Sequence, residues 1–161
     1  MPLWYDVQAE QDLVRVELRR RAYYQYLSAI ADDLPAFTKE FALSDWYYSD
    51  SDRNPHDSWV ETVEIREHAS GDHRQVRNIQ IKVELLTASH SGRITFRYHN
   101  VVSYDLESWG NEPSKHGDWL SDEISLASGG NIVHEVLFSS GVKWRIKCNS
   151  ISYEYTATEV S

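Results

Sequence analysis

The chain has 161 residues, 25 of them acidic and 16 basic, so its formal net charge is −9 when the histidines are neutral. Its apolar fraction of 41% excludes a disordered acidic tail, a collagen-like chain and a coiled-coil rod, and its charge argues against a general nucleic-acid coat. A chain of this length buries about 70% of its unfolded surface in one core, so we expect a single domain over residues 1–161.

Cys148 is the only cysteine, which excludes an internal disulfide and a cysteine cluster for zinc. The first residues show no basic leader followed by an apolar segment, and no apolar run approaches the length of a membrane span. We therefore expect a cytoplasmic protein without membrane association, and we predict no cofactor.

Residues 1–44 are predicted to form the helical part of the domain. From about residue 7 to residue 33, helix formers dominate and apolar side chains recur three or four positions apart, which predicts one long amphipathic helix. Pro35 ends this helix, because a proline disfavours the helical conformation of the residue before it. A shorter second helix is expected over residues 36–43.

Residues 58–157 are predicted to form a sheet, because apolar residues there alternate with polar ones. Three such runs, around 59–65, 79–85 and 94–104, are joined by short polar linkers and predict an antiparallel meander. Two more cover 132–138 and 142–148, and residues 151–155 either continue the last strand past a bulge or form another. The fold class is therefore α+β: one amino-terminal helix, or two, packed on a mainly antiparallel, twisted sheet of five or six strands. Trp59, Trp144 and Cys148 are expected on its buried face.

Residues 107–130 are predicted to be a long irregular loop, since they are rich in turn-forming residues and have little periodicity. Long loops of this kind often bind partners. Residues 105–130 contain six acidic residues and one basic residue, and residues 35–70 contain eight acidic residues and three basic ones. The acidity of the chain is therefore concentrated in this loop and in the segment that joins the helices to the sheet.

An acidic loop has two interpretations: a surface for a basic partner, or an ordinary solvated surface that folds over basic strands. Tryptophans in a loop are likewise either packing anchors or interface residues. On the first interpretation, the predicted partner-binding residues are Trp109, Glu112, Asp118, Trp119, Asp122 and Glu123.

The polar positions of the predicted strands are basic instead. Side chains two positions apart share one face of a strand, so these positions form basic rows. An anion or a nucleic acid is a further candidate ligand for them, although the net charge repels phosphate. The predicted anion-binding residues are Arg93, Arg97, Lys143, Arg145 and Lys147.

Residues 50–61 hold the densest cluster of oxygen donors. Compared with a calcium-binding loop, the candidate metal ligands are Asp50, Asp52, Asn54 and Glu61. A proline occupies the position where that loop needs a glycine, so a turn rich in Asp and Asn is the other interpretation. The adjacent His56 and Asp57, together with loop carboxylates, suggest as an alternative function a small-ligand or cation-dependent enzyme or binding protein.

Three segments together resemble a class of small, sheet-rich bacterial proteins. They are residues 55–60 (PHDSWV), residues 96–106 (FRYHNVVSYDL) and residues 134–146, within a similar region that covers about residues 55–155. Some of these similar families are taken to be immunity proteins of polymorphic toxin systems, and the resemblance implies no catalytic residues. This resemblance, together with the acidic segments, leads us to expect a non-enzymatic protein that neutralises a basic toxin by occlusion.

Overall fold

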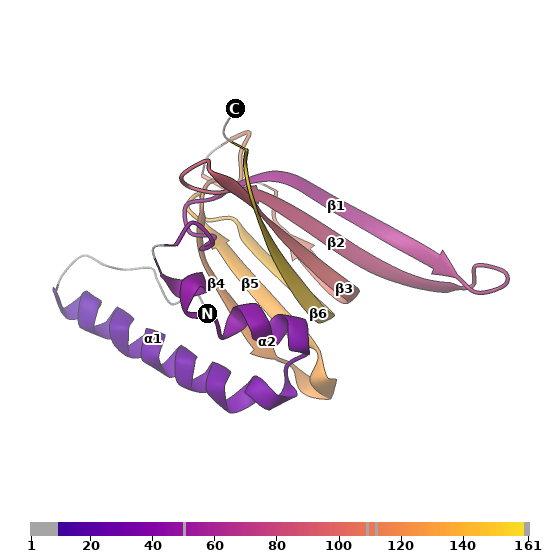
Figure 1. Cartoon of the computed structure of the whole chain (residues 1–161), viewed down its shortest axis with the longest axis horizontal. Helices are drawn as coiled ribbons and strands as arrows, with labels where there is room; N and C mark the ends of the chain where they lie inside the picture. The colour runs from indigo at the N-terminus through magenta and orange to yellow at the C-terminus, as the bar shows by residue number, and fades with distance from the viewer. Residues whose placement is uncertain (1–9, 50, 109, 112, 160–161) are drawn as a thin grey trace.

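The structure, a computed structural model, describes residues 10–49, 51–108, 110, 111 and 113–159. Helices lie on one face of an antiparallel sheet (Figure 1), which confirms the predicted α+β fold. The elements are α1 (Glu10–Ile30), η1 (Ala31–Asp33), α2 (Ala36–Ala42), η2 (Asp45–Tyr48), β1 (Trp59–Ser70), β2 (Val76–Leu86), β3 (Gly92–Leu106), β4 (Trp119–Leu126), η3 (Ser128–Gly130), β5 (Ile132–Phe138) and β6 (Lys143–Ala157). No helix in the described part of the chain is long and apolar enough to cross a membrane.

The strands form one sheet in the order β1-β2-β3-β6-β5-β4, and every neighbouring pair is antiparallel. The predicted meander of the first three strands is confirmed. The last strand lies at the centre and joins the meander to β4 and β5. Residues 151–155 continue β6, whose buried side chains change from even to odd positions between Cys148 and Ile151. This change lies opposite Asn100 of β3, whose φ is +49°.

The predicted loop over residues 107–130 is wrong in its second half, because β4 runs from Trp119 to Leu126. Its register with β5 shifts between Trp119 and Ser121, so buried side chains lose strict alternation there. Two acidic residues in the middle of the strand hide the pattern further. The connection between β3 and β4 is therefore residues 107–118, about half the predicted length.

Trp144 and Cys148 are buried as predicted, but the prediction for Trp59 is wrong. Trp59 is 49% exposed, because it begins an edge strand. Its ring packs against the imidazole of His90. Burial raises the pKa of the Cys148 thiol to about 12, which suits an inert core residue.

The helices satisfy backbone groups that the sheet leaves unpaired. The backbone N–H groups of Ile124 and Leu126, on the outer edge of β4, donate to the hydroxyl oxygens of Tyr23 and Tyr26 of α1 at 2.7 and 2.9 Å. β6 extends past the end of β5, and there Thr38 of α2 both donates to the carbonyl of Ile151 and accepts from its N–H. Covering an edge in this way prevents pairing with other strands.

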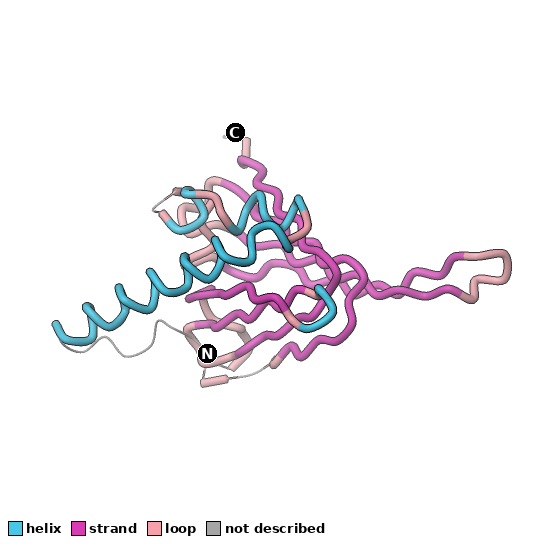
Figure 2. The backbone as a smooth tube through the Cα atoms, turned by 90° about the horizontal axis from the view of Figure 1, so that it is seen from below, coloured by secondary structure: helices cyan, strands magenta, loops and turns pink. Residues whose placement is uncertain are grey.

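The hairpin of β1 and β2 projects from the body of the sheet (Figure 2). β2 pairs with β3 only from Ile79 to Leu86, so the distal hairpin, residues 67–78, has no other neighbouring strand in the described part of the chain.

Candidate functional site

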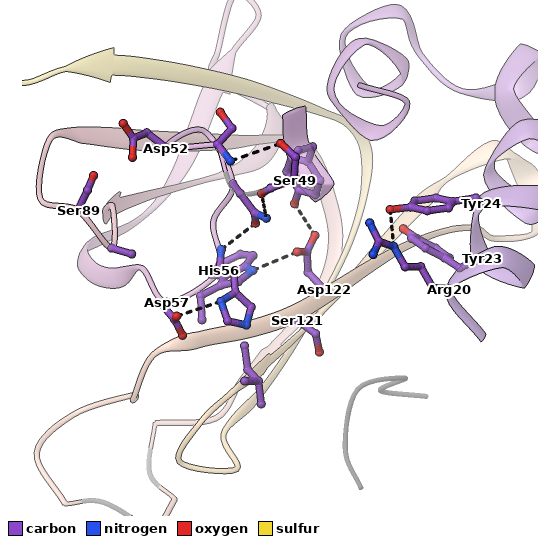
Figure 3. Close-up of a pocket in the computed structure, with 16 residues that line it drawn as sticks. Arg20, Tyr23, Tyr24, Ser49, Asp52, His56, Asp57, Ser89, Ser121 and Asp122 are labelled. Carbon is purple, nitrogen blue, oxygen red and sulfur yellow. Dashed lines mark hydrogen bonds and ion pairs between the residues drawn. The ribbon is translucent and has the colours of Figure 1, made fainter. Parts of the chain in front are cut away.

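A pocket of about 550 Å³ lies where α1, the connector (residues 43–58) and the start of β4 meet (Figure 3). Residues from four separate parts of the sequence line it, including the turn between β2 and β3. The charged and aromatic members of this lining are Arg20, Tyr23, Tyr24, Tyr47, Asp52, His56, Asp57, Trp119 and Asp122. A pocket of this size accepts a small molecule or one or two side chains of a protein partner.

The connector enters the pocket through a tight turn. The side chain of Asn54 donates to the carbonyl of Ser49 at 2.6 Å, and its Oδ1 accepts the N–H of His56 at 2.9 Å. Such Asx turns fix a loop without a regular element. His56 Nδ1 then lies 3.1 Å from Asp57 Oδ2, with about half of each side chain exposed. The two side chains therefore contact each other at the rim of the pocket.

Two backbone hydrogen bonds attach the end of the connector to β4. The N–H of Asp57 donates to the carbonyl of Trp119 at 2.8 Å, and the N–H of Trp119 donates to the carbonyl of Ser58 at 2.9 Å. Asp57 adopts a φ of +61°, which Asp and Asn tolerate better than most residues. Since Ser58 immediately precedes β1, these bonds bring the two edge strands of the sheet together at one corner.

Asp122 forms the floor of the pocket and the centre of a buried hydrogen-bond network. Its Oδ2 accepts from the Tyr47 hydroxyl at 2.5 Å and lies 2.7 Å from Nε2 of His134, and its Oδ1 accepts from the indole of Trp119 at 3.0 Å. His134 Nδ1 lies 2.8 Å from the hydroxyl of Tyr98. With a neutral imidazole that carries its proton on Nε2, every one of these contacts has a donor and an acceptor.

This network holds the fold and does not present a reactive group. The order Tyr98–His134–Asp122 matches that of a nucleophile, a base and an orienting carboxylate. However, Tyr98 is 1% exposed and His134 is fully buried, so no substrate reaches the phenol oxygen in this structure. Burial also raises the pKa of Tyr98 well above its usual value, which keeps the phenol protonated.

The four predicted partner-binding residues that the structure describes do not form one surface. Trp119 is fully buried, so its prediction as an exposed partner contact is wrong. Asp122 receives three hydrogen bonds and lines the pocket, so a partner would contact it only inside the pocket. Asp118 precedes β4, in a segment held by the turn between β5 and β6, where Ser139 Oγ accepts its N–H at 2.8 Å. Trp109 and Glu112 lie outside the described residues.

Glu123 lies on the other face of the sheet. There it is adjacent to Glu135, which in turn pairs across the strands with Arg145, and the three border a groove of about 360 Å³. Burial first, and then the carboxylates of Glu135 and Asp122, raise the pKa of Glu123 to about 7. The side chains of Asp122 and Glu123, which are adjacent in the sequence, therefore point to opposite faces of the sheet.

The predicted metal ligands are not brought together. Glu61 forms an ion pair with Arg93 at 2.6 Å, and Asn54 uses its side-chain oxygen in the Asx turn. Asp52 lines the pocket, and Asp50 lies outside the described residues. Within the part of the chain that the structure describes, no three His, Cys, Asp or Glu side chains are grouped as a metal would require. Glu61 and Asn54 are therefore engaged elsewhere, and a cation site at Asp50 and Asp52 stays a prediction.

Three of the five predicted anion-binding residues form ion pairs with carboxylates of other strands. The ion pairs are Arg93 with Glu61 at 2.6 Å, Arg97 with Glu154 at 2.9 Å, and Arg145 with Glu135 at 3.7 Å. The hydrogen bond that Arg93 donates to Glu61 raises the pKa of Arg93. Lys143 and Lys147 lie on the same face of β6 as Arg145. Because three of the five cations are already paired, this face does not form the unbroken basic row that the sequence predicts.

Several residues of the site could not be assigned from the sequence. Arg20, Tyr23 and Tyr24 appeared only as parts of a helix, and Tyr47 carried no motif. His134 did carry a signal, because it shares one face of its strand with Ile132 and Val136, and a histidine on an apolar face needs a buried hydrogen-bond partner.

Comparisons with protein-family models, with curated proteins and with solved structures find no match.

Proposed function

We propose that this chain is a protein-binding protein that captures a basic segment of its partner in the pocket between α1, the connector and β4. The observation that carries the proposal is the lining of that pocket, which combines three tyrosine side chains with the carboxylates of Asp52, Asp57 and Asp122. The resemblance to immunity proteins suggests the purpose, which is to neutralise a toxin by covering it.

A guanidinium or ammonium group suits this lining on two grounds. Carboxylates attract it over a distance and raise the rate of association, and tyrosine faces stabilise it by cation–π contacts of about 0.5–2 kcal/mol each. The protein itself holds two arginines in this way. The guanidinium of Arg20 lies 5.4 Å from the ring centre of Tyr24 at the pocket, and that of Arg53 lies 5.7 and 5.5 Å from the ring centres of Trp46 and Tyr155.

The test uses a hexa-arginine peptide as a probe, with a hexa-glutamate peptide for comparison, and records amide NMR shifts and affinity at two salt concentrations. We expect the arginine peptide alone to shift signals from residues around the pocket. Replacing both Asp52 and Asp57 by Asn should weaken binding at least tenfold and reduce its dependence on salt. Asn tolerates the positive φ at position 57, so the fold is preserved.

Asp72→Asn is the matched control, because Asp72 is an exposed aspartate at the tip of the projecting hairpin. If the control weakens binding as much as the pocket variant does, or if the arginine peptide shifts no signal near the pocket, the assignment is wrong. Purification of the protein with its bound partners from its native host would then identify the surface that is used.

A small-molecule ligand is the second candidate, because the pocket volume is typical of small-ligand sites and the His56–Asp57 pair opens onto it. This alternative includes a cation-dependent binding protein or enzyme. Calorimetric titration with calcium, magnesium, manganese and zinc tests the cation form. A stoichiometric response that Asp52→Ala abolishes would favour it over capture of a basic segment.

A further inference from the structure

The outer edge of β1 differs from the other edge of the sheet. α1 covers the outer edge of β4 with two tyrosine hydroxyls, whereas β1 is the terminal strand of the sheet over 12 residues. No backbone group of β1 bonds to the described part of the chain other than through its pairing with β2. A long edge of this kind is a template for one more strand.

The sequence of β1 shows which strand fits. Two copies of one strand can pair antiparallel about a two-fold axis that is perpendicular to the sheet and lies between the strands. Facing side chains share one face only if the residue at this axis faces its own copy. If that residue is Ile65, residues 60 to 70 of one copy face residues 70 to 60 of the other. This register uses almost the whole of β1, which runs from Trp59 to Ser70.

Charge selects the same register. With the axis at Ile65, Glu64 of each copy faces Arg66 of the other, and no two like charges face each other. Moving the axis by one residue places Glu64 opposite Glu64, or Arg66 opposite Arg66, and like charges directly across two strands are destabilising. Within one chain Glu64 and Arg66 already lie 3.0 Å apart, on one face of the strand, with 44% and 61% of their side chains exposed. Two copies would thus bring together four charges of alternating sign.

The centre of the other face of the pair is apolar. Ile65 is 45% exposed although it lies opposite the buried Ile81 of β2. In the same register Ile65 of one copy faces Ile65 of the other, so the exposed side chain is covered by its own equivalent. Apolar β-branched pairs across strands contribute to pairing.

We propose that a second copy of this chain binds along β1, antiparallel and centred on Ile65, so that two six-stranded sheets become one continuous sheet. This inference is independent of the proposed function, because β1 does not line the pocket.

Sedimentation velocity at protein concentrations from about ten to several hundred micromolar tests this dimer, with variants in which the two facing charges are exchanged. The wild type should show a concentration-dependent dimer. Glu64→Arg and Arg66→Glu should each raise the dissociation constant at least tenfold, because each places like charges opposite one another twice. An equimolar mixture of the two variants should dimerise again, because every facing pair is then of opposite sign.

Glu67→Arg is the control, since Glu67 faces Val63 in this register and its replacement should leave the dimer intact. Recovery in the mixture requires both variants to be folded, so failure to fold cannot imitate the expected result. A wild type that stays monomeric throughout the range, single variants that dimerise as well as the wild type, or a mixture that stays monomeric would each overturn the inference.

Discussion

His134 Nε2 lies 2.7 Å from Asp122 Oδ2 in the interior of the protein, and this contact ties β5 to β4 beneath the pocket. A carboxylate is costly to bury unless hydrogen bonds replace the water that it loses. Asp122 receives such bonds from three elements, because Tyr47 belongs to η2, His134 to β5 and Trp119 to its own strand. The floor of the pocket is therefore rigid, and the carboxylate at its surface has a fixed orientation.

Replacing Asp122 by Ala should lower the free energy of unfolding by about 3 kcal/mol, because three buried donors lose their acceptor. Urea denaturation followed by tryptophan fluorescence measures this change. Asp52→Ala is the control, since Asp52 lines the same pocket but is exposed, and it should change stability by less than about 0.5 kcal/mol. Equal stabilities of the two variants would show that the network does not hold the core.

The strands with a clear difference between their two faces could be predicted from alternation, as Ile81, Val83 and Leu85 show. β4 could not, because a shift of register and a buried carboxylate remove the alternation. The pocket could not be predicted either, since strand register rather than sequence spacing brings its residues together. Asp122 and His134 are 12 positions apart, and they meet because Ile124 pairs with His134 across the two strands.

Gly117→Ala should destabilise the protein more than Gly129→Ala. Both glycines have a positive φ, +87° and +81°, so each substitution carries the same conformational cost of about 1 kcal/mol. A Cβ at position 117 would also lie 2.7 Å from Ser139 Oγ and 2.8 Å from the backbone nitrogen of Ser140, whereas nothing lies within 4 Å at position 129. The difference between the two melting temperatures measures the contact of the 107–118 connection with the turn after β5. No difference would mean that this connection does not pack there.

Thr38→Val should cost about 2 kcal/mol, although it keeps the shape of the side chain. The Thr38 hydroxyl accepts from the N–H of Ile151 at 2.9 Å and donates to its carbonyl at 3.1 Å, so valine leaves two buried backbone groups without a partner. Thr38→Ser keeps the hydroxyl and should cost about 1 kcal/mol, for the loss of one methyl group. Chemical denaturation of both variants separates hydrogen bonding from packing, and a serine variant less stable than the valine variant would contradict the role given to the hydroxyl.

Glu123 should make the protein less stable as the pH rises from about 4.5 to about 7. Burial, together with the carboxylates of Glu135 and Asp122, raises the pKa of Glu123 from 4.5 to about 7 in the folded state. Between these two values the folded chain binds more of this proton than the unfolded chain, so the free energy of unfolding falls as pH increases. The carboxyl is partly exposed, and solvent screening reduces the expected change to about 1–2 kcal/mol.

Free energies of unfolding at pH 5 and pH 8 measure this change, and Glu123→Gln should remove this part of the pH dependence. Glu40→Gln, at an exposed position of α2, should follow the wild type. Parallel pH profiles for the wild type and Glu123→Gln would show that the proton on Glu123 is not bound more tightly in the folded state.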